Sequence, residues 1–489
     1  ELTSYVKSKN YKHVLWEICN EPNEDTDGDP HRPGVWGGIK KYAKKALPII
    51  EKNDPQSVVM VGTPQWDQAV SLPVEDPITD TYNLHIMYSF HYYAGDQERY
   101  LGLLNSATAF IPLFVTEWGL SSHTGDSGCD TKSGQKLMDV CSGMNLGNQI
   151  VSWANWSWSD KGESSGTFTG GGYNNLSFSD AGNFIKNQLK KGDNFQNSDS
   201  EAYEVQEVGG VEDFYLALEK FDKGGNYKGY YDFDEDWACD IVHKSAPCSE
   251  NVGDAGKDGV RSDEAVDLGY TDKNNKADSY INVGYIGMGE WVKYTLDLKY
   301  AGDYDFELYT CNHIDTNVVA FTVDGKNALV DQDGNEVYRA VKLQTSGSGV
   351  KDGGYDDWGW TKPKSPYSPS SSFRLHFDEA GKHTLGIVFF SSCSGLGSLK
   401  LLGDANRPSS APLTYRDNAI SVWPNPSENG AFNVSVSKPS KVEIFDIQKL
   451  VYSQNIESET QFNLNLAKGV YIVKITNDNE SVTKKLIVK

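Results

Sequence analysis

The sequence lacks long hydrophobic runs: no stretch approaches the roughly 18 consecutive apolar residues of a membrane-spanning helix. Positively charged residues are also in the minority: 45 Lys and Arg are outnumbered by 68 Asp and Glu, which gives a formal net charge of −23. Binding to nucleic acid or anionic membranes needs clustered cations, so the balance argues against both. A neutral polysaccharide is indifferent to it, and the 12 Trp, 27 Tyr and 19 Phe suit sugar stacking.

An initiator Met and a signal peptide are also lacking, so we expect the natural N-terminus to lie upstream of Glu1. Cysteine is scarce. The seven cysteines offer three local pairs, which are Cys129 with Cys141, Cys239 with Cys248 and Cys311 with Cys393. Short loops closed by paired cysteines predict an exported protein, and seven free thiols are the alternative. Cys19 is the odd one and is expected to be buried and reduced.

The length predicts about three domains. Residues 1–192 alternate strands with helical stretches, as in a (β/α)8 barrel. The expected strands are 14–18, 57–61, 84–90, 113–115 and 150–154, and the expected helical stretches include 39–51 and 135–144.

The remaining sequence is rich in β-type patterns. Residues 193–210 read as a linker, and residues 211–405 predict a jelly-roll-like β-sandwich in which 290–298 and 304–310 are half-buried strands. A second linker is expected at 406–417. Residues 418–489 then predict a small β-sandwich with strands at 441–447, 470–475 and 483–488.

Two glutamates stand at predicted strand ends. Pro22 ends the strand before Glu21, and Gly119 permits a turn after Glu117. In a barrel the carboxyl ends of all strands face one mouth, so both side chains should converge there. Retaining glycosidases need two carboxyl groups roughly 5–5.5 Å apart. Either glutamate alone would more often be a solvated loop residue.

Asn20-Glu21-Pro22 and Thr116-Glu117-Trp118-Gly119 resemble the fourth and seventh strand ends of glycoside hydrolase family 5 endoglucanases. The resemblance covers residues 1–192 and implies that Glu21 is the general acid/base and Glu117 the nucleophile. The further residues that it implies are Asn20 for the substrate 2-hydroxyl, His91 and Tyr93 as supports of the carboxyl groups, Trp156 stacking at the cleavage point, Lys161 and Glu163 on the non-reducing side, and Trp66 on the leaving side. No metal or cofactor is implied for catalysis.

The same resemblance implies that the first three strands of the barrel are missing from this chain. Open strand edges would then remain unpaired. We therefore expect the chain alone to be inactive or insoluble and its intact parent to be active.

Three runs in the middle region resemble family 6 carbohydrate-binding modules: 218–225, 283–294 and 301–304. The resemblance implies that Tyr285 and Trp358 sandwich a sugar ring, with Trp360 as the competitor for the second position. It also implies a structural calcium, although Ala217 replaces one of the usual acidic residues. A sandwich that only spaces or stabilises is the alternative.

The C-terminal runs 420–426, 469–475 and 484–489 resemble the sorting domain of the type IX secretion system. This implies export by the outer-membrane secretion machinery, followed by surface attachment or release.

The leading interpretation is a secreted, retaining endo-β-1,4-glucanase that cuts cellulose or related β-glucans. The alternatives are a mannanase or xylanase on the same fold, or a non-catalytic polysaccharide-binding surface protein.

Overall fold

The computed structural model describes residues 1–23, 33–170, 177–192, 195–232, 253–312, 318–336, 339–342, 358–364, 372–391, 394–404, 421–428, 430–436, 439–446, 449–458, 460–464, 466–477 and 481–488. The chain divides into two compact units, Glu1–Arg407 and Pro408–Lys489. None of the described helices combines the length and the apolar character needed to cross a bilayer.

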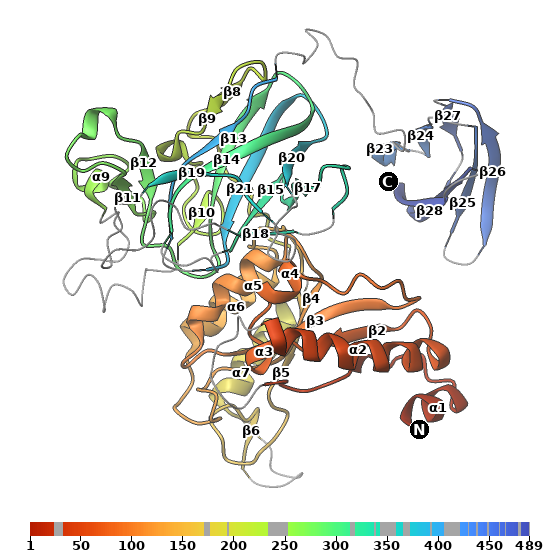
Figure 1. Ribbon diagram of the computed structural model, residues 1–489. Helices are drawn as coiled ribbons and strands as arrows, with labels where there is room; N and C mark the ends of the chain where they lie inside the picture. The colour runs from red at the N-terminus through yellow and green to blue at the C-terminus, as the bar shows by residue number, and fades with distance from the viewer. Residues whose placement is uncertain are drawn as a thin grey trace. The chain divides into compact units, whose positions relative to one another are not determined.

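The first unit begins with a parallel half-barrel of five strands, paired in chain order (Figure 1). The strands are β1 (Trp16–Glu17), β2 (Val58–Val61), β3 (His85–Tyr93), β4 (Leu113–Gly119) and β5 (Ser152–Asn155). Each overlaps one of the strands expected from the sequence, which confirms the parallel arrangement.

Helices connect these strands. They are α1 (Leu2–Ser8), α2 (Pro33–Asn53), α3 (Pro64–Asp67), α4 (Ser71–Glu75), η1 (Glu98–Tyr100), α5 (Leu101–Ala107), α6 (Thr131–Cys141) and α7 (Asp180–Lys191), with a hairpin of β6 (Phe168–Thr169) and β7 (Ser177–Phe178) before the last. The predicted stretch 39–51 lies within α2, and 135–144 overlaps α6. Side-chain caps start two of the helices: Asp130 accepts from the Ser133 N–H, and Ser179 accepts from the Gly182 N–H.

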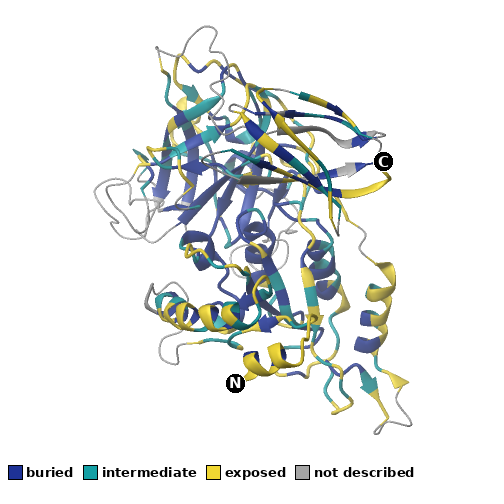
Figure 2. Cartoon of the chain, turned by 90° about the vertical axis from the view of Figure 1, so that its right-hand side faces the viewer, coloured by how far each residue is buried: buried dark blue, intermediate teal, exposed yellow. Residues whose placement is uncertain are grey.

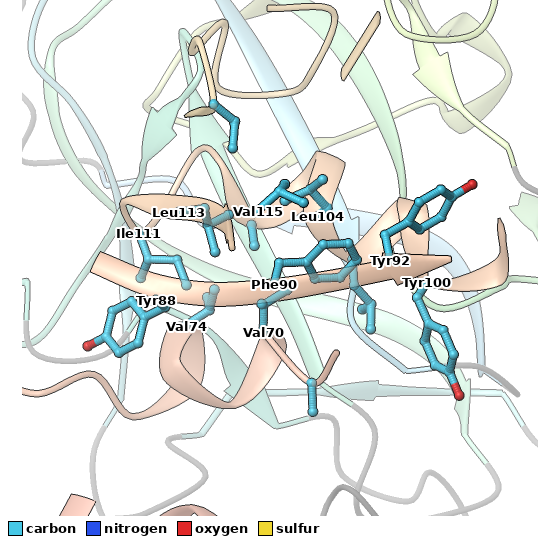
Figure 3. Packing of buried hydrophobic residues seen from close by; sticks show 14 of the residues in the cluster. Val70, Val74, Tyr88, Phe90, Tyr92, Tyr100, Leu104, Ile111, Leu113 and Val115 are labelled. Atoms are coloured by element: carbon cyan, nitrogen blue, oxygen red, sulfur yellow. The ribbon is translucent and has the colours of Figure 1, made fainter. Parts of the chain in front are cut away.

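The core of the half-barrel forms around β3, the central strand. Figure 3 shows Phe90 of β3 between Val70, which precedes α4, and Val115 of β4. All three side chains are fully buried. Tyr88, Phe90 and Tyr92 of β3 belong to this core, while Ser89 and His91, which alternate with them, are buried polar residues.

A two-sheet module completes the first unit. Its seven-stranded sheet consists of β8 (Gln206–Val208), β10 (Tyr230–Tyr231), β13 (Glu290–Leu298), β15 (Val318–Val323), β16 (Lys326–Asn327), β18 (Val341–Lys342) and β21 (Gly381–Phe389). Its eight-stranded sheet consists of β9 (Phe214–Tyr215), β11 (Leu268–Tyr270), β12 (Ile281–Val283), β14 (Gly302–Asn312), β17 (Leu329–Val330), β19 (Gly359–Thr361), β20 (Arg374–Phe377) and β22 (Ser394–Leu401). The short helical elements are η2 (Leu218–Lys220), α9 (Asp254–Lys257) and η3 (Lys276–Asp278). Apolar side chains from both sheets form a single core cluster.

Strand β13 is buried on both faces, so the prediction of a half-buried strand was wrong there. Val292, Tyr294 and Leu296 belong to the module's core. Trp291, on the other face, belongs to the core cluster of the half-barrel and donates from Nε1 to Asn105 Oδ1 of α5 at 2.8 Å. The burial colours of Figure 2 show the strands of this unit as largely buried.

Lys293 of β13 is a buried cation beside the same junction, only 5% exposed, and its Nζ donates to Ser198 O at 3.1 Å. Burial lowers the pKa of Lys293 to about 8, although the charges of Asp199 and Asp222 oppose this. In the unfolded chain the lysine keeps its proton to about pH 10.4. Between pH 8 and 10 the unfolded state therefore binds more protons than the folded state, and the free energy of unfolding should rise with pH.

We therefore expect Lys293 to make the free energy of unfolding rise by about 3 kcal/mol from pH 8 to pH 10.5. Chemical denaturation across this range, on the wild type and on Lys293→Met, checks the effect. As the pH rises, the free energy of unfolding of the wild type should increase relative to that of Lys293→Met. A difference that stays constant with pH would contradict it.

Two predictions about chain organisation need correction. Part of the expected linker 193–210 is ordered sheet, because β8 pairs in parallel with Leu296–Leu298 of β13. Residues 406–417 lie outside the described residues. The Cys129–Cys141 disulfide is also wrong, since both thiols are free.

The physical reason is the helix between the two cysteines. The 11 residues of α6 span about 16 Å, well beyond the ~7 Å that a disulfide allows between Cα atoms. Cys19 is free but only partly buried. Cys239, Cys248 and Cys393 lie outside the described residues, so the other two pairs stay predictions.

The second unit is one seven-stranded sheet. Its strands are β23 (Ser421–Glu428), β24 (Ala431–Ser435), β25 (Ser440–Phe445), β26 (Leu450–Ile456), β27 (Thr460–Asn463), β28 (Gly469–Thr476) and β29 (Ser481–Val488). The three strands predicted at 441–447, 470–475 and 483–488 overlap β25, β28 and β29. Phe432 stacks on Phe462 in its core, with ring centroids 5.2 Å apart.

Candidate active site

A cleft of about 650 Å³ lies where the five parallel strands end. Because carboxyl ends of parallel strands share one edge, segments far apart in sequence meet there. The cleft is lined by Asn20, Glu21, Gln65, Trp66, Gln68, His91, Tyr93, Asp96, Gln97, Arg99, Tyr100, Glu117, His123, Thr124, Gly125, Trp156, Lys161 and Glu163. All nine barrel residues proposed from the sequence are among them.

The two glutamates approach each other closely. One carboxyl oxygen of Glu21, one of Glu117 and a ring nitrogen of His91 all lie within 4.8 Å of one another. Glu21 follows β1 in a left-handed conformation, with φ of 47°. Glu117 lies in β4 opposite His91 of β3, where the register shifts between Phe90 and His91.

Glu21 is held from two sides. Its Oε1 lies 3.0 Å from His91 Nδ1, and its backbone N–H donates to Asp67 Oδ2 at 2.8 Å. Burial lowers the pKa of His91, but the hydrogen bond to Glu21 and nearby carboxylates outweigh it and raise that pKa overall. The neighbouring carboxyl groups thus make the imidazole easier to protonate than that of a free histidine.

Glu117 accepts a hydrogen bond from Tyr93, whose hydroxyl lies 2.7 Å from Oε1. Burial and this hydrogen bond raise the pKa of Tyr93, so the phenol keeps its proton and donates it to the carboxylate. Gly119 contributes by its missing side chain rather than by a turn. A Cβ there would lie 2.9 Å from the Tyr93 ring, so glycine lets the ring pack against the strand.

For the glycosidase activity expected from the sequence, Tyr93→Phe should lower kcat about 10- to 100-fold, since a hydrogen bond to a charged group contributes roughly 1.5–3 kcal/mol. The loss should fall on kcat more than on KM, because Tyr93 orients the carboxylate rather than binding the ground-state sugar. Steady-state kinetics on a soluble glucan measure this. An unchanged kcat would show that Tyr93 does not act through Glu117.

Trp156, predicted for the cleavage point, lies next to Lys161 and Glu163, predicted for the non-reducing side. The Trp156 ring is 40% exposed, and the Lys161 ammonium lies 5.0 Å from its centroid. Lys161 also pairs with Glu163 at 2.7 Å. The Glu163 carboxyl fills the space beside Gly125, where φ is +87° and a Cβ would lie 2.9 Å away.

Trp66, predicted for the leaving side, is 48% exposed in α3, which follows β2. Its neighbours were not predicted. Gln65 and Arg99 both donate to the Tyr100 hydroxyl, at 2.8 and 2.9 Å, and build the cleft wall on this side. Asp67, behind them, was also missed. These residues follow no motif, so only their position after strand ends could have suggested them.

The two residues predicted for sugar binding by the module are Tyr285 and Trp358. Tyr285 is 55% exposed, with φ of 52°. Trp358 stacks on Tyr309 instead, with centroids 5.7 Å apart and an interplanar angle of 28°. Their pairing across a sugar, and the calcium near Ala217, stay predictions.

Residues 3–162 match the sequence model of the family described as cellulase (glycosyl hydrolase family 5). The half-barrel is a glycosyl hydrolase family 5 domain. This confirms the resemblance seen in the sequence, and for such a domain a (β/α)8 barrel is the expected fold.

Curated relatives of the family 5 domain include an endoglucanase from Clostridium saccharobutylicum, 35% identical over 187 residues, or 37% of this chain and 38% of that protein. Endoglucanase E-5 from Thermobifida fusca is 33% identical, over 36% of this chain and 38% of that protein. This chain thus spans well under half of either relative. A crystal structure of the Thermobifida fusca endoglucanase Cel5A catalytic domain is 29% identical with a TM-score of 0.32, covering 39% of this chain and 60% of that one.

Residues 421–489 match the family described as secretion system C-terminal sorting domain. The sorting domain of the type IX system predicted from the C-terminal motifs is confirmed, and with it an exported, extracellular or cell-surface location.

Proposed function

We propose that the family 5 domain belongs to a retaining endo-β-1,4-glucanase that hydrolyses cellulose or related β-glucans by double displacement. The observation that carries this proposal is the approach of Glu21 and Glu117 within 4.8 Å. Retaining glycosidases have their carboxyl groups about 5–5.5 Å apart, whereas inverting enzymes leave roughly 6.5–9.5 Å for a water molecule.

In the first step Glu117 attacks the anomeric carbon while Glu21 gives its proton to the departing glycosidic oxygen. Tyr93 donates to Glu117 Oε1 and so holds the carboxylate in place until it forms the glycosyl-enzyme bond. In the second step Glu21, now ionised, takes a proton from water, which attacks the same carbon and releases Glu117. Asn20 would bond the 2-hydroxyl as positive charge develops on the sugar ring.

These steps require only side chains of the chain itself, so no cofactor forms part of the proposal. The exposed rings of Trp156 and Trp66 provide stacking for the sugar at the cleavage point and for a sugar on the leaving side, respectively. The two curated relatives are named endoglucanases, which favours glucan over mannan or xylan.

Hydrolysis of carboxymethyl cellulose, mannan and xylan by the full-length protein tests the proposal. We expect a rapid loss of viscosity on the cellulose derivative and products whose new reducing end has the β configuration by NMR. Preference for mannan or xylan would favour the same chemistry on another glycan. No hydrolysis of any of them would favour a binding protein.

A second function, sugar binding by the module, is favoured by aromatic rings on the outer face of its eight-stranded sheet. Tyr309 contacts both Trp358 and Trp360, and Tyr280 contacts Tyr309 and Trp360. Gly395 and Gly397 lie under Trp358, where a Cβ would come within 2.8 and 3.1 Å of the ring. We propose that this surface, or the Tyr285 loop, binds polysaccharide.

Pull-down on cellulose and xylan should use the whole protein, since Trp291 joins the module to the half-barrel. All proteins carry Glu117→Gln to prevent hydrolysis. If the aromatic sheet face binds the polysaccharide, adding Trp360→Ala should reduce binding. If the Tyr285 loop binds it, adding Tyr285→Ala should reduce binding. Unchanged binding in both variants would leave the module as a spacer. We also propose the outer-membrane secretion machinery as the partner of the sorting domain.

A further inference from the structure

Asp67 is a buried carboxylate that no step of the proposed mechanism uses. Its side chain is fully buried at the end of α3, directly behind the cleft. It closes a run of three residues in the left-handed conformation: Gln65, Trp66 and Asp67 have φ of 57°, 54° and 62°. L-residues adopt this conformation at an energetic cost, and a run of them persists only where surrounding contacts fix it.

The carboxylate supplies such contacts. Oδ1 accepts from the Thr63 N–H at 2.6 Å, which closes the turn onto the end of β2. Oδ2 accepts from the Glu21 N–H at 2.8 Å, which ties the same turn to the end of β1. Glu21 is itself in the left-handed conformation. Asp67 therefore fixes both the turn that contains Trp66 and the backbone of Glu21, the proposed proton donor.

The contacts of Asp67 close a ring around Glu21. Asp67 Oδ2 lies 3.6 Å from His91 Nε2, and the other ring nitrogen, Nδ1, lies 3.0 Å from Glu21 Oε1. Nε2 also lies 3.1 Å from Thr116 Oγ1. The backbone of Glu21 is thus held directly by Asp67 and its carboxyl group indirectly, through the imidazole.

The charges agree with this geometry. Burial raises the pKa of Asp67 to about 7, while His91 and the two N–H donors work against the rise. An ionised Asp67 in turn favours a protonated His91. Glu17 belongs to the same group, since single ligand atoms of Glu17, Asp67 and His91 lie within 4.8 Å of one another, but its Oε1 accepts from Ser89 rather than from Glu21.

We infer that Asp67 is a positioning residue for the acid/base: it aims the Glu21 carboxyl group at the glycosidic oxygen by holding both the Glu21 backbone and the His91 ring. The inference rests on the proposed glycosidase function. It requires that loss of Asp67 harm proton donation and spare the attack by Glu117, whose contact with Tyr93 does not involve Asp67.

Leaving-group dependence separates these two effects. A glucan leaves as an alkoxide that needs the proton of Glu21, whereas 2,4-dinitrophenyl cellobioside releases a stable phenolate without it. In Asp67→Asn the amide has only one oxygen, so either the Thr63 or the Glu21 N–H must face an NH2 group. We expect kcat/KM to fall 10- to 100-fold on carboxymethyl cellulose and less than about 2-fold on the aryl cellobioside.

Azide provides a second readout, since it attacks the glycosyl-enzyme without a general base. It should raise kcat of Asp67→Asn on the aryl cellobioside and not that of the wild type. Glu17→Gln is the matched control: it removes a neighbouring negative charge but no bond to Glu21, and both kcat/KM values should stay within about 2-fold of the wild type.

Equal losses on both substrates would overturn the inference, because they would indicate a purely structural role, and so would unchanged kinetics. If Asp67→Asn does not fold, Asp67→Ser, whose hydroxyl can accept from one N–H, is judged by the same criterion. Inactivity of the intact, full-length wild-type protein on both substrates would instead refute the proposed function.

Discussion

Glu117→Gln should lower kcat on carboxymethyl cellulose by about 10³-fold or more, a loss of at least roughly 4 kcal/mol of transition-state stabilisation. The amide keeps the shape of the side chain, but it cannot form the glycosyl-enzyme. Binding should change little, since Glu117 meets the sugar at the reacting carbon only. Steady-state kinetics together with binding of cellotetraose to the variant measure the two effects separately.

The roles of the two glutamates can be distinguished by product stereochemistry. With an aryl β-cellobioside and azide, Glu117→Ala should give the α-glycosyl azide, because azide attacks from the side that the nucleophile vacated. Glu21→Ala should give the β-glycosyl azide, because azide then attacks the α-linked intermediate. The opposite pattern would exchange the assignments.

A glutamate away from the cleft controls for the general effect of losing a carboxylate. Glu51 of α2 accepts from the Asn83 N–H at 2.6 Å and lies outside the cleft lining. Glu51→Gln should leave kcat within about 2-fold of the wild type, since surface substitutions seldom exceed 0.5 kcal/mol. A comparable loss in both variants would remove the case for Glu117 as nucleophile.

The half-barrel and its cleft could be predicted because their signals are local. A strand that ends in Asn20-Glu21-Pro22, and another that ends in Glu117-Trp118-Gly119, fix which residues stand at one edge of a parallel sheet. The structure places both carboxyl groups there, within reach of one sugar ring. The same reasoning places Tyr93, the last residue of β3, and Trp156, which directly follows β5, at this edge.

Features that depend on folding across long distances were not predictable. Asp67 acts on Glu21, 46 residues away, and nothing in the sequence near either residue indicates the bond. The supposed Cys129–Cys141 pair failed because proximity in sequence was counted and the intervening helix was not. Strand β13 alternates apolar with mostly polar residues, and only Trp291 hinted that its second face is covered.

The face of β13 that packs against the half-barrel should contribute strongly to the stability of the protein. Trp291→Ala should lower the free energy of unfolding by about 3–5 kcal/mol, as for other large aromatic side chains removed from a core. The ring is fully buried between the module and α5. Its indole N–H donates to Asn105 Oδ1, which also accepts from the Leu146 N–H at 3.2 Å and so keeps one partner in the variant. Denaturant unfolding followed by circular dichroism measures the change.

Trp291→Phe separates packing from hydrogen bonding, because it keeps most of the ring and loses the donor; the expected cost is about 1–2 kcal/mol. Trp158→Ala is the matched control, since that ring is 79% exposed, and it should cost less than about 1 kcal/mol. If the half-barrel and the module unfolded independently, Trp291→Ala would leave the half-barrel transition where it is. A shift of the half-barrel signal together with that of the module is what a shared core requires, because removing one side chain from it weakens both partners at once.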